Sequence, residues 1–73
     1  MLTKQEKAYM AGVGAKIKEI RKKAKLTQRD IYIRVGIPQN TISDYERGER
    51  NPTLLQLLRL SGALGCEVWE FLP

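Results

Sequence analysis

Apolar and polar residues between Thr27 and Glu46 follow the spacing of two short helices joined by a tight turn. An α-helix advances by about 100° per residue. In the second helix, which begins near Gln39, Ile42 and Tyr45 therefore fall on one side and the polar residues on the other. The pattern predicts a helix that packs one face on the domain and exposes the other, as a helix presented to a DNA groove does. Any solvated helix can share this pattern.

The polar residues of that second helix carry chemistry suited to base edges. They lie within an arc of roughly 140° and are Gln39, Asn40, Ser43, Asp44 and Arg47. Amide side chains pair bidentately with adenine, a carboxylate accepts from the cytosine amino group, and a guanidinium binds guanine or phosphate. The face therefore matches the donor and acceptor groups of the major groove.

The turn between the two helices has the residues that a helix-turn-helix requires. Gly36 can adopt the positive φ that ends the first helix, and Pro38 suits the first turn of the second. The connection is then about three residues long. Thr27 can cap the first helix, and Gln28 projects from its N-terminus, where free N–H groups and the helix dipole favour a phosphate.

With these motifs in place, the chain resembles the Cro/repressor-like (XRE) helix-turn-helix family of phage and bacterial regulators, from about Val13 to Leu72. The resemblance implies an all-α, compact five-helix domain over residues 13–73, whose third helix enters the major groove, usually with a two-fold partner. The matching segments, in the expected order and spacing, are Ile17–Arg21, Leu26–Gln28, Val35–Ile37, Thr41–Ser43, Tyr45–Gly48, Asn51–Leu54 and Ala63–Gly65.

The resemblance also implies a role for individual side chains. Residues that would face base edges are Gln39, Asn40, Ser43 and Asp44. Residues that would lie near the DNA backbone are Gln28, Thr41, Arg47, Arg50 and Asn51, together with Lys16 at the start of the first helix. Arg21 and Glu46 match a partly buried ion pair between the first and third helices, so we interpret Glu46 as structural rather than as a base reader.

Three residues depart from the family pattern without removing a group that DNA binding needs. Tyr32 stands where alanine is usual, so its ring is either accommodated by changed helix packing, which we expect, or leans outward with its hydroxyl toward DNA or water. Pro38 replaces the usual serine or threonine, so the side-chain cap is absent. Lys25 replaces a common glycine.

The remaining apolar positions predict the scaffold around the motif. In the first helix the expected buried stripe is Val13, Ile17, Ile20 and Ala24. Thr53 and Gln56 have capping-box spacing, and the stripe that follows toward Gly65 is Leu54, Leu57, Leu60, Ser61 and Leu64. A short last helix over Glu67 to Leu72 would close the core with Val68 and Leu72. Cys66 is most simply a core thiol.

A further set of apolar residues lies off these stripes. An apolar patch on a small domain often marks a partner surface, and a DNA reader of this type is expected to work in pairs. We therefore place a homodimer contact on Leu55, Leu58, Trp69 and Phe71. In the alternative, Trp69 folds back over the core as a lid.

Charge is unevenly distributed along the 73 residues, whose net charge is +5. Residues 1–25 hold eight Lys or Arg and two Glu, and the remainder holds five Arg and six acidic residues. The lysines of the first helix can bind phosphates without sequence preference or can simply solvate an outer face.

Before that helix, residues 1–12 form a segment with capping-box spacing at Thr3 and Glu6. Gly12 and Gly14 weaken a helix, so we expect Met1 to Ala11 to be partly helical or frayed.

Several function classes lack support in the sequence. The chain has no histidine and one cysteine, so we expect no metal, disulfide or cofactor. No signal peptide or membrane span is visible, which favours a cytoplasmic, nucleoid-associated protein without a membrane partner. Five packed helices predict no cleft for an enzyme. The sequence predicts a double-stranded DNA-binding regulator, and the resemblance implies that it acts as a repressor. The alternative is a protein-interaction module, such as an antitoxin that binds a toxin, or the N-terminal part of a longer regulator with an effector domain.

Overall fold

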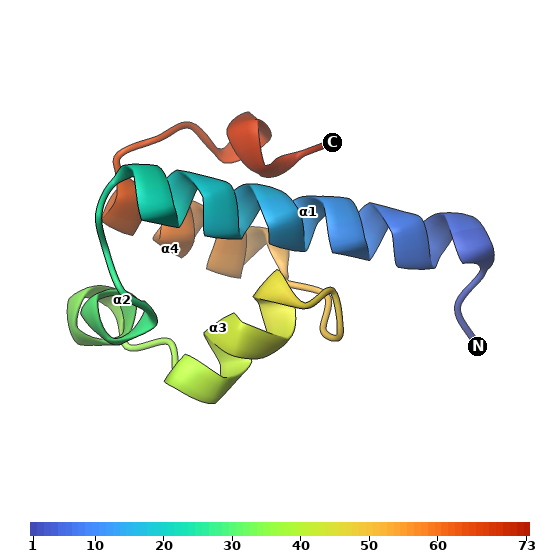
Figure 1. Cartoon of the computed structure of the whole chain (residues 1–73), viewed down its shortest axis with the longest axis horizontal. Helices are drawn as coiled ribbons and strands as arrows, with labels where there is room; N and C mark the ends of the chain where they lie inside the picture. The colour runs from blue at the N-terminus through green and yellow to red at the C-terminus, as the bar shows by residue number, and fades with distance from the viewer.

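The computed structural model describes all residues, 1–73, and contains helices but no strands. The predicted all-α class is confirmed, and five helical segments are present, the last being a short 3₁₀ helix (Figure 1). The elements are α1 (Lys4–Lys23), α2 (Gln28–Val35), α3 (Gln39–Glu46), α4 (Leu54–Leu64) and η1 (Val68–Phe71).

Helix α1 is longer than the sequence suggested. The Thr3 hydroxyl accepts from the Glu6 N–H and the Glu6 carboxylate accepts from the Thr3 N–H, so the expected capping box starts the helix. The helix then runs unbroken through Gly12 and Gly14, and of the segment expected to be partly helical or frayed, Lys4 to Ala11 are helical and residues 1–3 precede the helix. Gly14 has a packing role, because a Cβ at this position would lie 2.1 Å from the carbonyl oxygen of Tyr45 in α3.

The helices surround one apolar core. In Figure 1, α3 lies below α1 and η1 lies above it, and both pack against α1; α2 packs against α3 and α4. The fully packed core draws on every element and consists of Val13, Ile17, Ile31, Ile37, Ile42, Tyr45, Leu57, Leu60, Leu64 and Phe71. Ile20 packs partly against this core, whereas Ala24, which was expected on the buried stripe, is the exposed C-cap of α1. None of the helices combines the length and apolar character needed to cross a membrane.

Phe71 and Leu72 exchange the roles that the sequence predicted for them. Phe71 is 0% exposed and lies in the core, so it cannot be a dimer contact, and Leu72 is exposed instead of closing the core. The reason is the 3₁₀ geometry of η1, in which residues three apart share a face. Val68 therefore packs on the same side as Phe71, whereas an α-helix would have placed it beside Leu72.

The N-terminus of α4 also differs from its prediction. The Thr53 hydroxyl accepts from the Gln56 N–H at 3.1 Å, but Gln56 does not complete the box, because its Oε1 accepts from Arg59. Leu54 is exposed on the outer face of the first turn, so it does not belong to the buried stripe. The later positions, Leu57, Leu60, Ser61 and Leu64, are buried as expected.

Around the turn, local chemistry matches the sequence prediction closely. Gly36 ends α2 at φ 77°, and Pro38 precedes α3 with no side-chain cap. Thr27 caps α2 and forms a reciprocal capping box with Asp30, which sequence analysis overlooked although the T-x-x-D spacing signals it.

Two residues that depart from the family pattern are placed by the structure. Lys25 has φ 58°, a left-handed conformation that explains why glycine is usual there. Tyr32 is 48% exposed, so the ring leans outward and the accommodation we expected is wrong.

Candidate DNA-binding surface

Helix α3 is held with one face in the core and the other toward solvent. Ile42 and Tyr45 are buried, and the close approach of the Tyr45 carbonyl to Gly14 sets the helix against α1. On the opposite face Gln39 and Asn40 are exposed. The helical periodicity of the sequence predicted this division, and the structure confirms it.

The C-terminal half of that face is a network of charged side chains, here called the arginine cluster, comprising Ser43, Asp44, Arg47, Glu49 and Arg50. Arg47 donates to the Ser43 hydroxyl, to Oδ1 of Asp44 at 2.5 Å and to Oε2 of Glu49 at 2.9 Å. Nη2 of Arg50 lies 3.3 Å from Oδ2 of Asp44. The hydrogen bond that Arg47 donates to Glu49, together with the negative charges of Glu49 and Asp44, raises the pKa of Arg47.

Glu49 was missed by sequence reasoning. It stands two residues after Arg47, in the turn that follows α3, and no helical pattern singles it out. The sequence offered one signal, the position of a negative charge between Arg47 and Arg50, where it can pair with either arginine. Ser43 and Asp44 are half-buried within the cluster, so in the free protein their polar atoms already have protein partners.

A second network fastens α3 to α1. The Arg21 guanidinium donates from Nε to Oε2 of Glu46 at 2.6 Å and from Nη2 to Oε1 at 3.0 Å, and its Nη1 binds the Leu26 carbonyl. The ion pair implied by the family resemblance is therefore present, and both of its side chains are largely buried. The hydrogen bond to Glu46 raises the pKa of Arg21, even though desolvation opposes this shift.

Gln28 joins this second network rather than standing free at the N-terminus of α2. Its Nε2 donates to Oε1 of Glu46 at 3.1 Å, and the side chain is half-buried. An amide nitrogen carries two hydrogens. One hydrogen therefore orients the amide against Glu46, and the second remains for an acceptor outside the protein.

The other candidate backbone residues are spread more widely. Thr41 is half-buried on α3, and Asn51 is exposed beyond the arginine cluster. Lys16 is not brought together with them. It lies 3.9 Å from Glu19 and lines a hollow with Glu70 of η1, about 160° around α1 from Gly14, the residue that faces α3.

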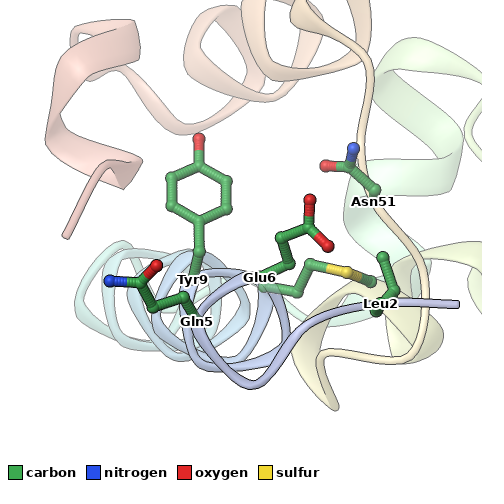
Figure 2. Close-up of a pocket in the computed structure, with 6 residues that line it drawn as sticks. Leu2, Gln5, Glu6, Tyr9 and Asn51 are labelled. Carbon is green, nitrogen blue, oxygen red and sulfur yellow. The ribbon is translucent and has the colours of Figure 1, made fainter.

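A small open hollow of about 330 Å³ lies between the first turns of α1 and the segment that precedes α4 (Figure 2). Its lining residues are Leu2, Gln5, Glu6, Tyr9, Met10 and Asn51. The Glu6 carboxylate accepts a hydrogen bond from the Thr3 N–H, and so caps α1.

The chain has no group of three or more His, Cys, Asp or Glu residues placed to hold a metal ion. Cys66 is half-buried beside the core, and burial raises the pKa of its thiol.

Exposed apolar side chains gather on the outer face of α4. Leu55 and Leu58 are exposed as the sequence predicted, and Leu54 lies on the same face. Trp69 of η1 is 63% exposed, so the alternative in which it covers the core as a lid is wrong. These exposed side chains are available for a protein contact, whereas Phe71 is buried and is not.

The fold and the exposed face of α3 define a small helix-turn-helix domain. A family model described as Helix-turn-helix matches residues 17–70, and the chain belongs to this XRE-type family of DNA-binding transcriptional regulators, which are not enzymes. The match begins at Ile17, so the first three turns of α1 lie outside the matched region.

Named relatives agree with this assignment. The chain is 42% identical over 53 residues to the HTH-type transcriptional regulator y4dJ of Sinorhizobium fredii, covering 73% of this chain and 69% of the relative. It is 41% identical over 56 residues to the immunity repressor protein of Bacillus phage phi105, covering 77% of this chain but only 39% of that longer protein.

A solved structure extends the likeness to a complex with DNA. The restriction-modification controller protein C.Esp1396I, crystallised as a tetramer with its natural 35 base-pair operator, superposes with a TM-score of 0.76 at 29% sequence identity. The alignment covers 85% of this chain and 82% of the controller protein. The helix-turn-helix arrangement described above is therefore shared with a protein that binds operator DNA.

Proposed function

We propose that this protein is a transcriptional repressor that binds a specific double-stranded DNA sequence as a homodimer, with α3 in the major groove. The observation that carries the proposal is the exposure of Gln39 and Asn40 on a helix whose opposite face, Ile42 and Tyr45, is buried. That orientation offers two amides to a groove while the buried face packs α3 against α1 and α2. The relation to a phage immunity repressor supports negative regulation.

Base reading would begin with the two amides. Gln39 and Asn40 stand at the N-terminal end of α3, and each can donate to N7 or accept from the N6 amino group of adenine. Ser43 and Asp44 lie further along the same face. Their polar atoms would exchange partners on docking, because they are bound to Arg47 in the free protein.

Backbone binding would flank this face. Arg47 and Arg50 are more than half exposed and could each bind a phosphate, as could the second amide hydrogen of Gln28. Thr41 and Asn51 would add neutral contacts. Lys16, turned toward η1, is left out of the proposed set.

The homodimer would form through exposed apolar residues of α4 and η1. Leu55, Leu58 and Trp69 supply the contact, and Leu54 enlarges it. A second copy is the occupant we commit to, because the related controller protein binds its operator as an oligomer. A two-fold pair of α3 helices would read an approximately palindromic operator with half-sites about 10 to 10.5 bp apart.

The test is selection of binding sites from a pool of random duplex DNA at about 150 mM salt, followed by sequencing. We expect an enriched inverted repeat with half-sites spaced by about one helical turn. Salt-sensitive binding without enrichment would refute base reading and would favour a protein-interaction module.

The dimer contact has its own test. Leu58→Glu places a charge in the proposed interface, and Ile33→Glu makes the same kind of change at an exposed residue of α2. Sedimentation equilibrium should show weakened self-association of Leu58→Glu and unchanged self-association of Ile33→Glu. Equal effects of the two substitutions, or none, would remove Leu58 from the interface.

A further inference from the structure

The surface proposed to face DNA is nearly neutral in the free protein. Between Gln39 and Asn51 the chain has three acidic residues and two arginines, and Glu46 is committed to Arg21 in the adjoining network. The other four charges are those of the arginine cluster, in which Arg47 and Arg50 meet Asp44 and Glu49. Basic excess lies elsewhere, in the first 25 residues.

Asp44 and Glu49 differ in how they are bound. Asp44 has a side chain exposed by only a quarter, and it binds both Arg47 and Arg50. Glu49 is 54% exposed, and Arg47 is its one side-chain partner. Removal of the Glu49 charge therefore alters a single arginine and leaves the rest of the cluster in place.

Glu49 occupies the edge of Arg47 that a phosphate would use. Both of its carboxylate oxygens lie within hydrogen-bond distance of Nε of Arg47, at 3.2 and 2.9 Å. Carboxylate and phosphate oxygens engage guanidinium N–H groups in the same planar manner. A phosphate that approaches Arg47 must therefore displace Glu49 or share the guanidinium with a like charge.

We propose that Glu49 is an internal competitor of DNA phosphate at Arg47 and lowers the affinity of the protein for DNA of any sequence. The inference rests on the proposed DNA-binding function of α3. In the free protein Glu49 pairs with Arg47, and a DNA phosphate must break this pair to bind the guanidinium. The penalty applies equally to every sequence because it acts at the backbone. Glu49 thus sets how strongly the regulator is held on DNA, while the amides of α3 set where it is held.

The test compares Glu49→Gln with Glu67→Gln. Both substitutions remove one negative charge at an exposed residue, but Glu67 belongs to the η1 end, on the other side of α1 from α3 (Figure 1). Binding is measured by fluorescence anisotropy to a labelled random-sequence duplex of about 30 bp, long enough for two half-sites with flanks. We expect Glu49→Gln to bind roughly threefold to tenfold more tightly, with a salt slope steeper by about one unit. Glu67→Gln should change little, because the charge is screened over about 8 Å.

A double-mutant cycle shows whether the effect passes through Arg47. In an Arg47→Ala background, Glu49→Gln should no longer strengthen binding. A gain that persists without Arg47, or a gain no larger than that of Glu67→Gln, would overturn the inference.

The outcomes remain separable from those of the proposed function. The ratio of affinities for a selected site and for random duplex should be the same in the wild type and in Glu49→Gln, and a changed ratio would overturn the assignment of Glu49 to the backbone. A wild type that shows no preference for any site would refute base reading, whereas the cycle with random duplex would still decide the role of Glu49.

Discussion

Arg21 and Glu46 are joined by two hydrogen bonds, 2.6 and 3.0 Å long, although 25 residues separate them in the sequence. The pair connects the last turns of α1 to the end of α3, and the same guanidinium holds the Leu26 carbonyl. Since Glu46 also orients Gln28, one carboxylate fixes the relative positions of α1, α2 and α3.

Replacement of Arg21 by alanine should therefore act mainly on stability. Arg21→Ala leaves the largely buried Glu46 carboxylate without its partner, and we expect a loss of about 3–5 kcal/mol in the free energy of unfolding. Thermal melting measures this loss, and DNA binding corrected for the folded fraction should fall less. Arg21→Lys, which retains the charge without the planar fork, should lie between. A wild-type melting curve for Arg21→Ala would contradict the prediction.

Gly14 and Gly62 form a matched pair of helical glycines. A Cβ on Gly14 would lie 2.1 Å from the Tyr45 carbonyl oxygen, whereas a Cβ on Gly62 would meet nothing within 4 Å. Gly14→Ala must separate α1 from α3, and we expect destabilisation of about 2–4 kcal/mol. Gly62→Ala should stabilise by about 0.5–1 kcal/mol, because alanine favours the helix. Chemical denaturation measures both, and similar effects of the two substitutions would refute the close-packing role of Gly14.

Lys25 carries backbone strain that glycine would relieve. Its φ of 58° is unfavourable for a residue with a Cβ, and no other residue except glycine has positive φ in this chain. Lys25→Gly should raise stability by about 0.5–1 kcal/mol after the entropy of glycine in the unfolded chain is subtracted. Lys22→Gly removes the same charge within α1 and should instead destabilise by about 1 kcal/mol. A lower thermal midpoint for Lys25→Gly would contradict this account.

The Asp30 carboxylate should make the stability of α2 depend on pH in acid. The backbone N–H of Thr27 donates to the ionised carboxylate at 2.7 Å, which holds the pKa of Asp30 below its ordinary value, and Arg34 and Arg29 add to the shift. Because the folded pKa is depressed, the stabilisation is complete above the unfolded pKa and is lost as pH falls through the folded pKa.

Asp30→Asn tests this dependence, because asparagine has no charge to lose. The thermal midpoint of the wild type should exceed that of Asp30→Asn near neutral pH, and the difference should shrink from about pH 4 downward. A difference that stays constant to the lowest pH at which the protein folds would show that the charge of Asp30 does not contribute.

Asn40 and Arg50 distinguish base reading from backbone binding. Asn40→Ala should weaken binding to the selected site by about 1–3 kcal/mol, with little change on random duplex, because the lost amide reads a base edge. Arg50→Ala should weaken binding to both DNAs and reduce the salt slope by about one unit. Equal losses of Asn40→Ala on both DNAs would remove this residue from the base readers.

Features governed by neighbouring residues could be predicted from the sequence. The Thr27 cap, the positive φ of Gly36 and the uncapped Pro38 are local, since each depends on backbone geometry within a few residues. The exposed amides and buried Ile42 of α3 followed from helical periodicity alone. These features were sufficient to indicate two helices joined by a tight turn and the face that carries the candidate site, whereas the five-helix fold was implied by the family resemblance.

Packing and partner choice depended on the assembled chain. Phe71 entered the core because η1 adopted a 3₁₀ rather than an α geometry, which rotates each side chain relative to its neighbours. Gly14 supports α1 in place of weakening it, because α3 approaches at that point. The bonds of Gln28 to Glu46 and of Glu49 to Arg47 likewise arise where flexible polar side chains meet across helices and turns. Helical periodicity assigns each residue to a face, but the choice among several possible partners depends on distances that exist only after the helices have packed.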